Sequence, residues 1–178
     1  MPYLVDQPQN VGSRRDLNTP TAAIFNAHVR DNLNFLYGAP SCRVYHNAAQ
    51  AITTATYTAV ALNSERFDND TMHNTVTLNS RITATTAGRY LFVSNVEFVA
   101  NATGIRESRI LRGATLIAGA LLPVVSVDAV TVLNVATIYS MAAADDVEIS
   151  VYQSSGGNLN VNSTANYSPE FMAHWLGN

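Results

Sequence analysis

Three side chains that could hold a metal ion lie within six positions of one another, namely Asp68, Asp70 and His73. Two carboxylates and an imidazole are ligands that Ca²⁺ or a transition metal accepts. The neighbours Asn69 and Asn74 give the same stretch the composition of a turn, in which short polar side chains bond to nearby backbone N–H groups. We therefore expect a turn here, with these three residues as weak candidates for a metal site, and no cofactor elsewhere.

The other reactive side chains are scattered along the sequence. Cys42 is the only cysteine, which excludes an intrachain disulfide, and we expect it to be a small buried residue, with a nucleophile as the alternative. The histidines His28, His46 and His174 stand far apart. The sequence contains no serine-hydrolase elbow, zinc-protease helix, phosphate loop or paired-cysteine motif. It therefore predicts no enzyme and no catalytic residue.

Two further stretches allow both a functional and a structural interpretation. Four charged residues alternate along a predicted strand: Arg106, Glu107, Arg109 and Arg112. They form either a row of ion pairs between subunits or a solvated strand face. The Gly156–Gly157 pair lies between two predicted strands, where it suits a hairpin turn, with a ligand-binding loop as the alternative.

The composition favours an oligomer and disfavours nucleic-acid binding. Charged residues make up 13% of the 178 positions, about half the usual share of a soluble domain. We therefore expect part of this weakly charged surface to be buried between chains. The net charge is −3 and like charges form no run, whereas a nucleic-acid site needs clustered positive charge.

The sequence also predicts neither a membrane span nor a signal peptide. The longest apolar run, residues 114–125, is interrupted by Pro123, and spanning a bilayer takes roughly 20 apolar residues. The first residues lack the basic and apolar regions of a signal peptide. We expect synthesis in the cytoplasm, without a membrane partner.

The chain divides into two parts of different pattern. Residues 1–41 contain a polar, aperiodic stretch through Asn18, which predicts an extended arm, and then one helix. Residues 42–178 are rich in Val, Ile, Thr, Tyr and Phe, in short runs broken by Asn, Gly, Ser and Asp. The predicted strands lie near residues 43–46, 57–62, 74–78, 81–85, 89–99, 106–112, 115–118, 130–140, 147–153, 159–162 and 171–176. The predicted fold class is all-β, a jelly-roll sandwich preceded by an arm and one short α-helix.

Two predicted elements carry the clearest patterns. Residues 89–99 are apolar on both faces at their start, which predicts a central strand covered on both sides. In the helix, Thr19 suits the N-cap and Pro20 the first turn, while Gly38 and Pro40 suit its end. Its apolar stripe consists of Phe25, Val29, Leu33 and Leu36. Such a stripe must be buried against its own domain, a sister chain or a partner, and we predict that it attaches the protein to a larger assembly.

The order of motifs in the main domain resembles that of C1q/TNF-like jelly rolls. Residues 63–68 resemble the family's "N…FD" element, and residues 81–92 resemble its "F-T-x-P-x-x-G-x-Y-x-F" signature. Residues 144–149 resemble its "x-G-D-x-V-x-L" strand, and residues 167–177 resemble its "S-x-F-x-G-x-L" end. Asp145 stands where the strand motif has Gly, and Ala173 lies near the last missing Gly.

That resemblance implies a homotrimer packed around an apolar and aromatic axis, and no enzyme. The candidates for the trimer core are aromatic residues of the predicted strands: Tyr90, Phe92, Phe98 and Trp175. Residues 20–33 are similar to the "T-A-A-x-x-N-x-x-V-R-D-N-L" helix found ahead of such domains in phage structural proteins. A collagen-like Gly-X-Y stem is missing from the sequence, so a complement-type architecture is not expected.

These features together predict a virion structural protein. We expect a trimer on the virion surface whose partners are the major capsid or tail proteins of the same particle. Residues 1–41 would attach it and residues 42–178 would be displayed. A capsid location is preferred slightly over the tail. The alternative is an adhesin or tail-fibre tip that binds a host receptor or a host-surface glycan.

Overall fold

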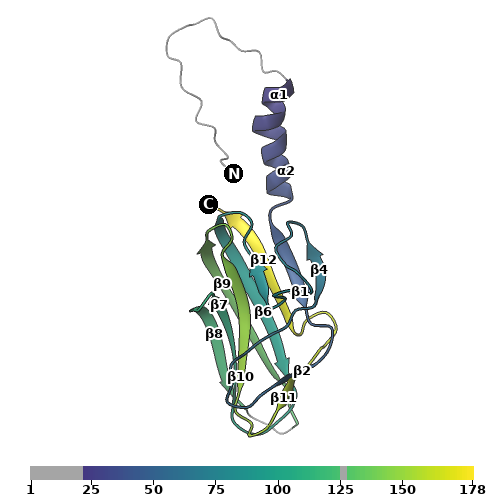
Figure 1. Cartoon of the computed structure of the whole chain (residues 1–178), viewed down its shortest axis with the longest axis vertical. Helices are drawn as coiled ribbons and strands as arrows, with labels where there is room; N and C mark the ends of the chain where they lie inside the picture. The colour runs from purple at the N-terminus through teal and green to yellow at the C-terminus, as the bar shows by residue number, and fades with distance from the viewer. Residues whose placement is uncertain (1–21, 125–127) are drawn as a thin grey trace, which may run out of the picture. The chain divides into compact units, whose positions relative to one another are not determined.

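A computed structural model describes residues 22–124 and 128–178 of the chain (Figure 1). Contacts divide the chain into two units, Met1–Ala39 and Pro40–Asn178. The boundary lies two residues before the position predicted from the sequence. The attachment and display functions assigned to the two parts stay predictions. Among the described residues, no helix has the length and apolar character needed to cross a membrane.

The first unit contains one helix with a π-helical segment in its middle. It comprises α1 (Ala22–Phe25), the π-helical η1 (Asn26–Arg30) and α2 (Asp31–Tyr37). Gly38 ends the helix by donating its N–H to Asn34 O at 2.9 Å, with φ of −107° rather than the left-handed conformation of a C′ glycine. The predicted arm and the predicted start of the helix at Thr19 and Pro20 lie outside the described residues.

The second unit is a sandwich of two antiparallel sheets, which confirms the predicted fold class. The seven-stranded sheet contains, in order, β2 (Gln50–Ile52), β11 (Leu159–Val161), β6 (Gly88–Phe98), β12 (Glu170–Gly177), β1 (Ser41–Tyr45) and β4 (Ser64–Asp68), with β9 (Thr131–Met141) paired to β6. The five-stranded sheet contains β3 (Thr58–Ala59), β10 (Asp146–Gln153), β7 (Ile105–Arg112) and β8 (Thr115–Pro123), with β5 (Arg81–Thr83) paired to β10.

Strand β6 forms the centre of the seven-stranded sheet, as its apolar sequence predicts. It pairs with β9 along its whole length and with β12 on its other edge. Its alternate residues Tyr90, Phe92, Val96 and Phe98 point into the sandwich and are at most 1% exposed. The residues between them, Leu91 and Val93, are half-buried on the opposite face. The outer face of this strand, which was also expected to be covered, is thus only partly covered within the described chain.

The aromatic residues predicted for the trimer core lie inside a single chain, and this prediction is wrong. Tyr90, Phe92 and Phe98 are at most 1% exposed, and Trp175 is 7% exposed. The Phe92 ring lies 5.9 Å from that of Tyr90 and 6.1 Å from that of Phe171. Because a two-sheet sandwich needs large side chains to fill its interior, these residues are unavailable to a neighbouring chain.

Two predicted local structures differ in the fold. Residues 74–78 form turns instead of a strand, because Asn74 Oδ1 accepts the N–H groups of Val76 and Thr77 at 2.9 and 2.8 Å. Gly156–Gly157 joins β10 in one sheet to β11 in the other, so it is an intersheet connection rather than a hairpin. The short strands β2 and β4 were not predicted.

Candidate functional site

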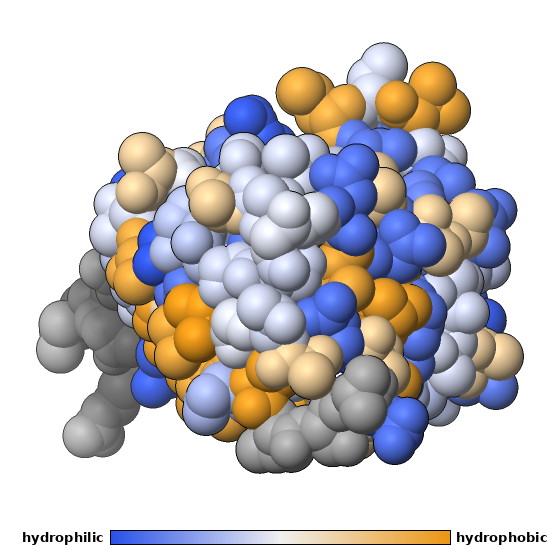
Figure 2. Space-filling model, turned by 90° about the horizontal axis from the view of Figure 1, so that it is seen from below, coloured by the Kyte–Doolittle hydropathy of each residue, from blue (hydrophilic) through white to orange (hydrophobic). Residues whose placement is uncertain are grey.

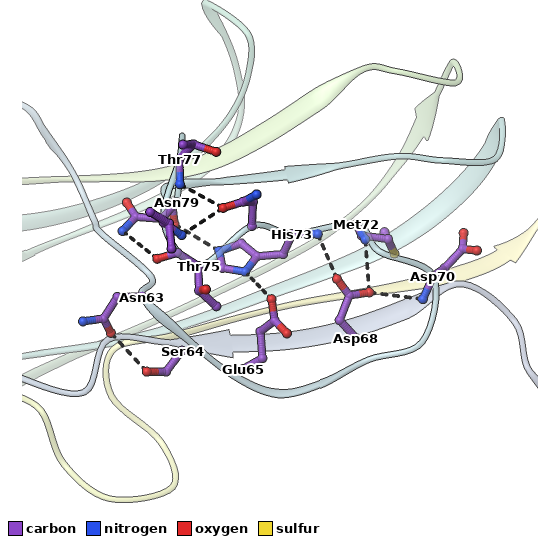
Figure 3. Close-up of polar contacts among 12 residues, drawn as sticks. Asn63, Ser64, Glu65, Asp68, Asp70, Met72, His73, Thr75, Thr77 and Asn79 are labelled. Atoms are coloured by element: carbon purple, nitrogen blue, oxygen red, sulfur yellow. Dashed lines mark hydrogen bonds and ion pairs between the residues drawn. The ribbon is translucent and has the colours of Figure 1, made fainter.

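The Asp68 carboxylate organises the turn that follows β4 (Figure 3). Its Oδ1 accepts the N–H groups of Asp70 and Met72 at 3.2 and 3.1 Å, and its Oδ2 accepts the N–H of His73 at 2.9 Å. Three backbone donors of one turn are therefore satisfied by a single side chain, as the turn composition predicted.

His73 holds the same loop through its ring, which is fully buried. Its Nδ1 lies 2.9 Å from Glu65 Oε1 and its Nε2 lies 3.1 Å from Asn79 O (Figure 3). The ring therefore bridges the Glu65 carboxylate on β4 and the backbone at the far end of the loop.

The three weak metal candidates do not converge on one point. Asp68 faces backbone N–H groups, His73 faces Glu65 and Asn79, and Asp70 bonds through its carboxylate to the Thr85 hydroxyl. Within residues 22–124 and 128–178, no group of three acidic, histidine or cysteine side chains is placed to hold a metal ion. The arrangement supports the interpretation as a turn.

A larger feature is the apolar outer face of the seven-stranded sheet. It consists of side chains that point away from the sandwich: Phe67, Leu91, Val93, Ile138 and Met172. Phe67 is 51% exposed and Ile138 is 58% exposed. A shallow depression of about 190 Å³ between β1, β4, β6 and β12 is lined mainly by such residues. Hydrophobic residues also reach the surface in patches in Figure 2.

The second apolar surface, called the β8 edge, consists of exposed leucines of β8: Leu116 and Leu121 on one face of the sheet and Leu122 on the other. Their exposed fractions are 51%, 51% and 44%. In the described chain β8 is hydrogen-bonded only to β7 and β9 only to β6, although β8 and β9 also lie close to each other. Exposed edges with apolar side chains are sites at which another chain can associate.

A buried ion cluster lies beside the outer face, and sequence patterns did not reveal it. Glu170 is 1% exposed and accepts from Arg43 Nε at 2.6 Å and Arg66 Nε at 3.1 Å. The Arg66 guanidinium carbon lies 4.0 Å from the centre of the Tyr45 ring. The cluster ties β1 and β4 to β12. Its two ion pairs span 127 and 104 positions, so local spacing gives no signal for it.

The alternating charges of β7 serve different contacts within one chain. Arg106 is fully buried, so it belongs neither to a solvated face nor to a row of ion pairs between subunits. Arg109 Nε donates to Glu107 Oε1 at 2.6 Å, and Arg112 donates to the Asp145 carboxylate at 2.6 Å. This last contact raises the pKa of Arg112 and lowers the pKa of Asp145.

The cysteine and the histidines are not assembled into a catalytic group. Cys42 is fully buried on β1, and burial, assisted by the negative charge of Asp68, raises the pKa of its thiol. Burial lowers the pKa of His46. His28 and His174 are exposed on the helix and on β12 respectively. The most prominent features of the described surface are therefore apolar surfaces suited to binding.

Comparison with known proteins shows the fold but no sequence family. No protein-family model and no curated protein sequence matches the chain. The globular domain of zebrafish complement 1qA has a TM-score of 0.51 and 14% identity over 78% of this chain and 99% of that domain. Murine APRIL has a TM-score of 0.58 and 12% identity over 77% and 98%. Eiger TNF from S. frugiperda has a TM-score of 0.59 and 11% identity over 78% and 94%. These likenesses confirm the predicted C1q/TNF-like jelly roll.

Proposed function

We propose that this chain is a non-enzymatic, homotrimeric structural protein of a phage particle, displayed on the particle surface and attached through its N-terminal segment. The observation that carries the proposal is the presence of two different apolar surfaces on one jelly roll. The outer face of the seven-stranded sheet and the β8 edge each leave large side chains exposed.

Two unlike surfaces favour a ring over a twofold dimer. A twofold contact joins a surface to a copy of itself, whereas a contact between two different surfaces repeats head to tail and closes into a ring. The β8 edge of one chain would pack on the outer face of the next, covering Leu91 and Val93 on the second side of β6. A ring of three chains agrees with the homotrimer that the C1q/TNF-like resemblance implies.

The particle location rests on the N-terminal segment. The stripe residues Phe25, Val29, Leu33 and Leu36 are between 38% and 64% exposed. Residues 20–33 are similar to the helix that precedes such domains in phage structural proteins. A threefold module suits threefold or quasi-threefold positions of an icosahedral shell, so decoration of the capsid is preferred over the tail. Electron microscopy of the particle distinguishes the two, because density for the trimer only at the tail contradicts the capsid location.

The oligomer is tested by light scattering at micromolar concentration. The wild-type protein is expected to have the mass of three 19.2 kDa chains. Ile138→Glu on the outer face and Leu121→Glu on the β8 edge should each give monomers, because each places a charge in an apolar contact. The control Val76→Glu, at a residue that is 82% exposed outside both surfaces, should remain trimeric. A monomeric wild type, or trimers of both interface variants, contradicts the proposal.

A further inference from the structure

A polar cleft opens on the outer side of the five-stranded sheet, and none of the residues that line it belongs to either apolar surface. The loop after β4 and the turn before β10 form its walls, and β5 and β10 form its floor. Its volume is about 500 Å³, which is within the range of small-molecule sites. The lining residues used below are Thr71, Thr77, Leu78, Arg81, Thr83, Ala144 and Asp146. We infer that this cleft binds a neutral saccharide, a function that does not depend on the trimer or on the particle location.

Backbone conformation singles out this cleft from the rest of the surface. Thr71 and Leu78 have φ of 52° and Ala144 has φ of 70°. All three are non-glycine residues in the left-handed region, and all three line the cleft. A positive φ is unfavourable for such residues, above all for the β-branched Thr71. Strained backbone of this kind concentrates at functional sites, so its clustering here indicates a wall of fixed shape.

Hydrogen bonds hold this wall in place without a ligand. Asp68 binds the backbone at the start of the loop, and Asn74 Oδ1 binds two N–H groups in its middle. His73 Nε2 contacts Asn79 O near the end of the loop (Figure 3). Met72 O accepts from Thr83 N at 2.7 Å, which joins the loop to the floor. A ligand would therefore meet a preformed site and would not have to order the loop.

Two charged side chains in the cleft keep hydrogen-bonding capacity for a ligand. Arg81 Nε lies 3.6 Å from Asp146 Oδ2 and 3.7 Å from Glu148 Oε2, longer than an effective hydrogen bond. Among the described residues, the Arg81 guanidinium and the Asp146 carboxylate make no hydrogen bond. Arg81 is paired by charge with Asp146 and Glu148, while its N–H groups and the Asp146 carboxylate keep hydrogen-bonding positions for a ligand. Two adjacent hydroxyls of a sugar ring, each able to donate and accept, match this pair.

The charge and the remaining lining select a neutral ligand. Arg81 contributes one positive charge, whereas Asp146 and Glu148 contribute two negative charges near it. This local excess of negative charge disfavours phosphate, sulfate and acidic sugars. The hydroxyls of Thr77 and Thr83 can both donate and accept, whereas the Thr71 hydroxyl donates to Asp70 O at 2.8 Å and adds an acceptor. The apolar side chains of Leu78 and Ala144 offer contact to the C–H face of a sugar ring.

Saturation-transfer NMR on the full-length protein tests the inference. The probes are methyl glycosides of glucose, mannose, galactose and N-acetylglucosamine, together with maltose, cellobiose and lactose. At least one probe is expected to receive saturation from the protein. Arg81→Gln and Asp146→Asn should each weaken its binding at least tenfold, because each removes half of the donor and acceptor pair. The Arg81 side chain is 41% exposed, so thermal melting of this variant should stay close to that of the wild type.

Arg89→Gln is the matched control, since Arg89 is an exposed arginine on β6 outside the cleft lining. This variant should bind the probe as the wild type does. The inference is overturned if none of the seven probes receives saturation. It is also overturned if both cleft variants keep their affinity, or if Arg89→Gln loses binding to the same extent.

Discussion

Arg106 is fully buried, and no carboxylate of the described residues pairs with it. Its guanidinium donates to backbone oxygens of Thr103 and Ile105 at 2.9 Å each and also contacts Asn101 O and Oδ1. Its Nε has no hydrogen-bond partner in the described part of the chain, and burial lowers the pKa of the group. Burying a charge is unfavourable unless other groups replace its hydration. Here the carbonyl groups of the connection between β6 and β7 replace it, so the arginine fixes that connection.

We predict that Arg106→Met lowers the free energy of unfolding by about 2 kcal/mol, because buried carbonyl groups lose their donors. Removing the desolvated charge offsets part of that loss. The measurement is urea unfolding at a fixed protein concentration, since a trimer makes the midpoint concentration-dependent. Arg89→Met, at an exposed arginine, is the control and should shift stability by less than about 0.5 kcal/mol. Equal or higher stability of Arg106→Met would mean that the desolvation cost exceeds the hydrogen bonds.

Cys42 should be unreactive in the folded protein. Its side chain is fully buried, and burial raises the pKa of the thiol. Because the thiolate is the reactive form, a raised pKa leaves the thiol protonated at neutral and mildly alkaline pH. We predict that a disulfide reagent such as DTNB labels Cys42 only when the chain is unfolded in denaturant. Stoichiometric labelling of the native protein at the rate of a free thiol would contradict this packing.

At the scale of elements, long apolar alternation was sufficient to predict strands. Strands β6, β9 and β10 lie within one or two residues of their predicted ends. Residues 74–78 also alternate like a strand, yet the Asn74 side chain binds the backbone N–H groups that a strand partner would need. Strands β2 and β4 are too short and too polar to show a period, and they exist because β11 and β1 pair with them.

The turn at Asp68 depends on contacts between residues close in sequence, whereas the cleft depends on contacts between residues far apart in sequence. Asp68 and the backbone that it binds lie within five residues of each other, so composition alone predicted that turn. The cleft depends on contact between the loop after β4 and the turn before β10, segments that are far apart in the sequence. Its strained residues, Thr71, Leu78 and Ala144, are not the glycines that a sequence signal for positive φ would require.

We predict that Asp68→Ala lowers the free energy of unfolding by about 2 kcal/mol, because three backbone N–H groups lose their acceptor. For a chain of this size the melting temperature should fall by roughly 4–8 °C, at about 2–4 °C per kcal/mol. Asp68→Asn keeps one acceptor oxygen and should lie between alanine and the wild type. EDTA should leave the melting temperature of the wild type unchanged. A fall with EDTA comparable to that of Asp68→Ala would show that the carboxylate holds a metal ion.

At the scale of the whole molecule, the low share of charged residues and the exposed apolar surfaces both indicate association with another chain. With charged residues at only 13% of the chain, the fold leaves Phe67, Ile138 and Leu121 about half exposed or more. The resemblance to C1q/TNF-like domains predicted a trimer but led to aromatic candidates inside the core. The strand period identifies two faces of a sheet, and it does not show which face turns inward. Only the folded sandwich distinguishes the interior from the proposed interface.

The first unit is proposed to attach the protein and the second to be displayed, which leads to a prediction about assembly. Pro40 O accepts from Trp175 N at 2.9 Å and Ser41 N donates to Asn69 Oδ1 at 2.8 Å. Residues 40 and 41 therefore belong to the jelly roll, and a truncation should remove residues 1–39. We predict that the truncated protein folds and forms trimers, because both apolar surfaces are retained. When the truncated protein is added to particles assembled without the wild-type protein, it should not bind to them.

A full-length variant separates loss of the stripe from loss of the arm. In Leu33→Glu/Leu36→Glu, two charges replace residues that are 59% and 64% exposed on the helix. If docking buries the stripe, the cost of desolvating these charges should strongly reduce the occupancy of the variant on particles. Asn34→Glu places one charge off the stripe and should bind as the wild type does. Full occupancy of the truncated protein would show that the jelly roll itself makes the attachment. If particle binding is lost on truncation but kept in the double variant, the arm makes the attachment.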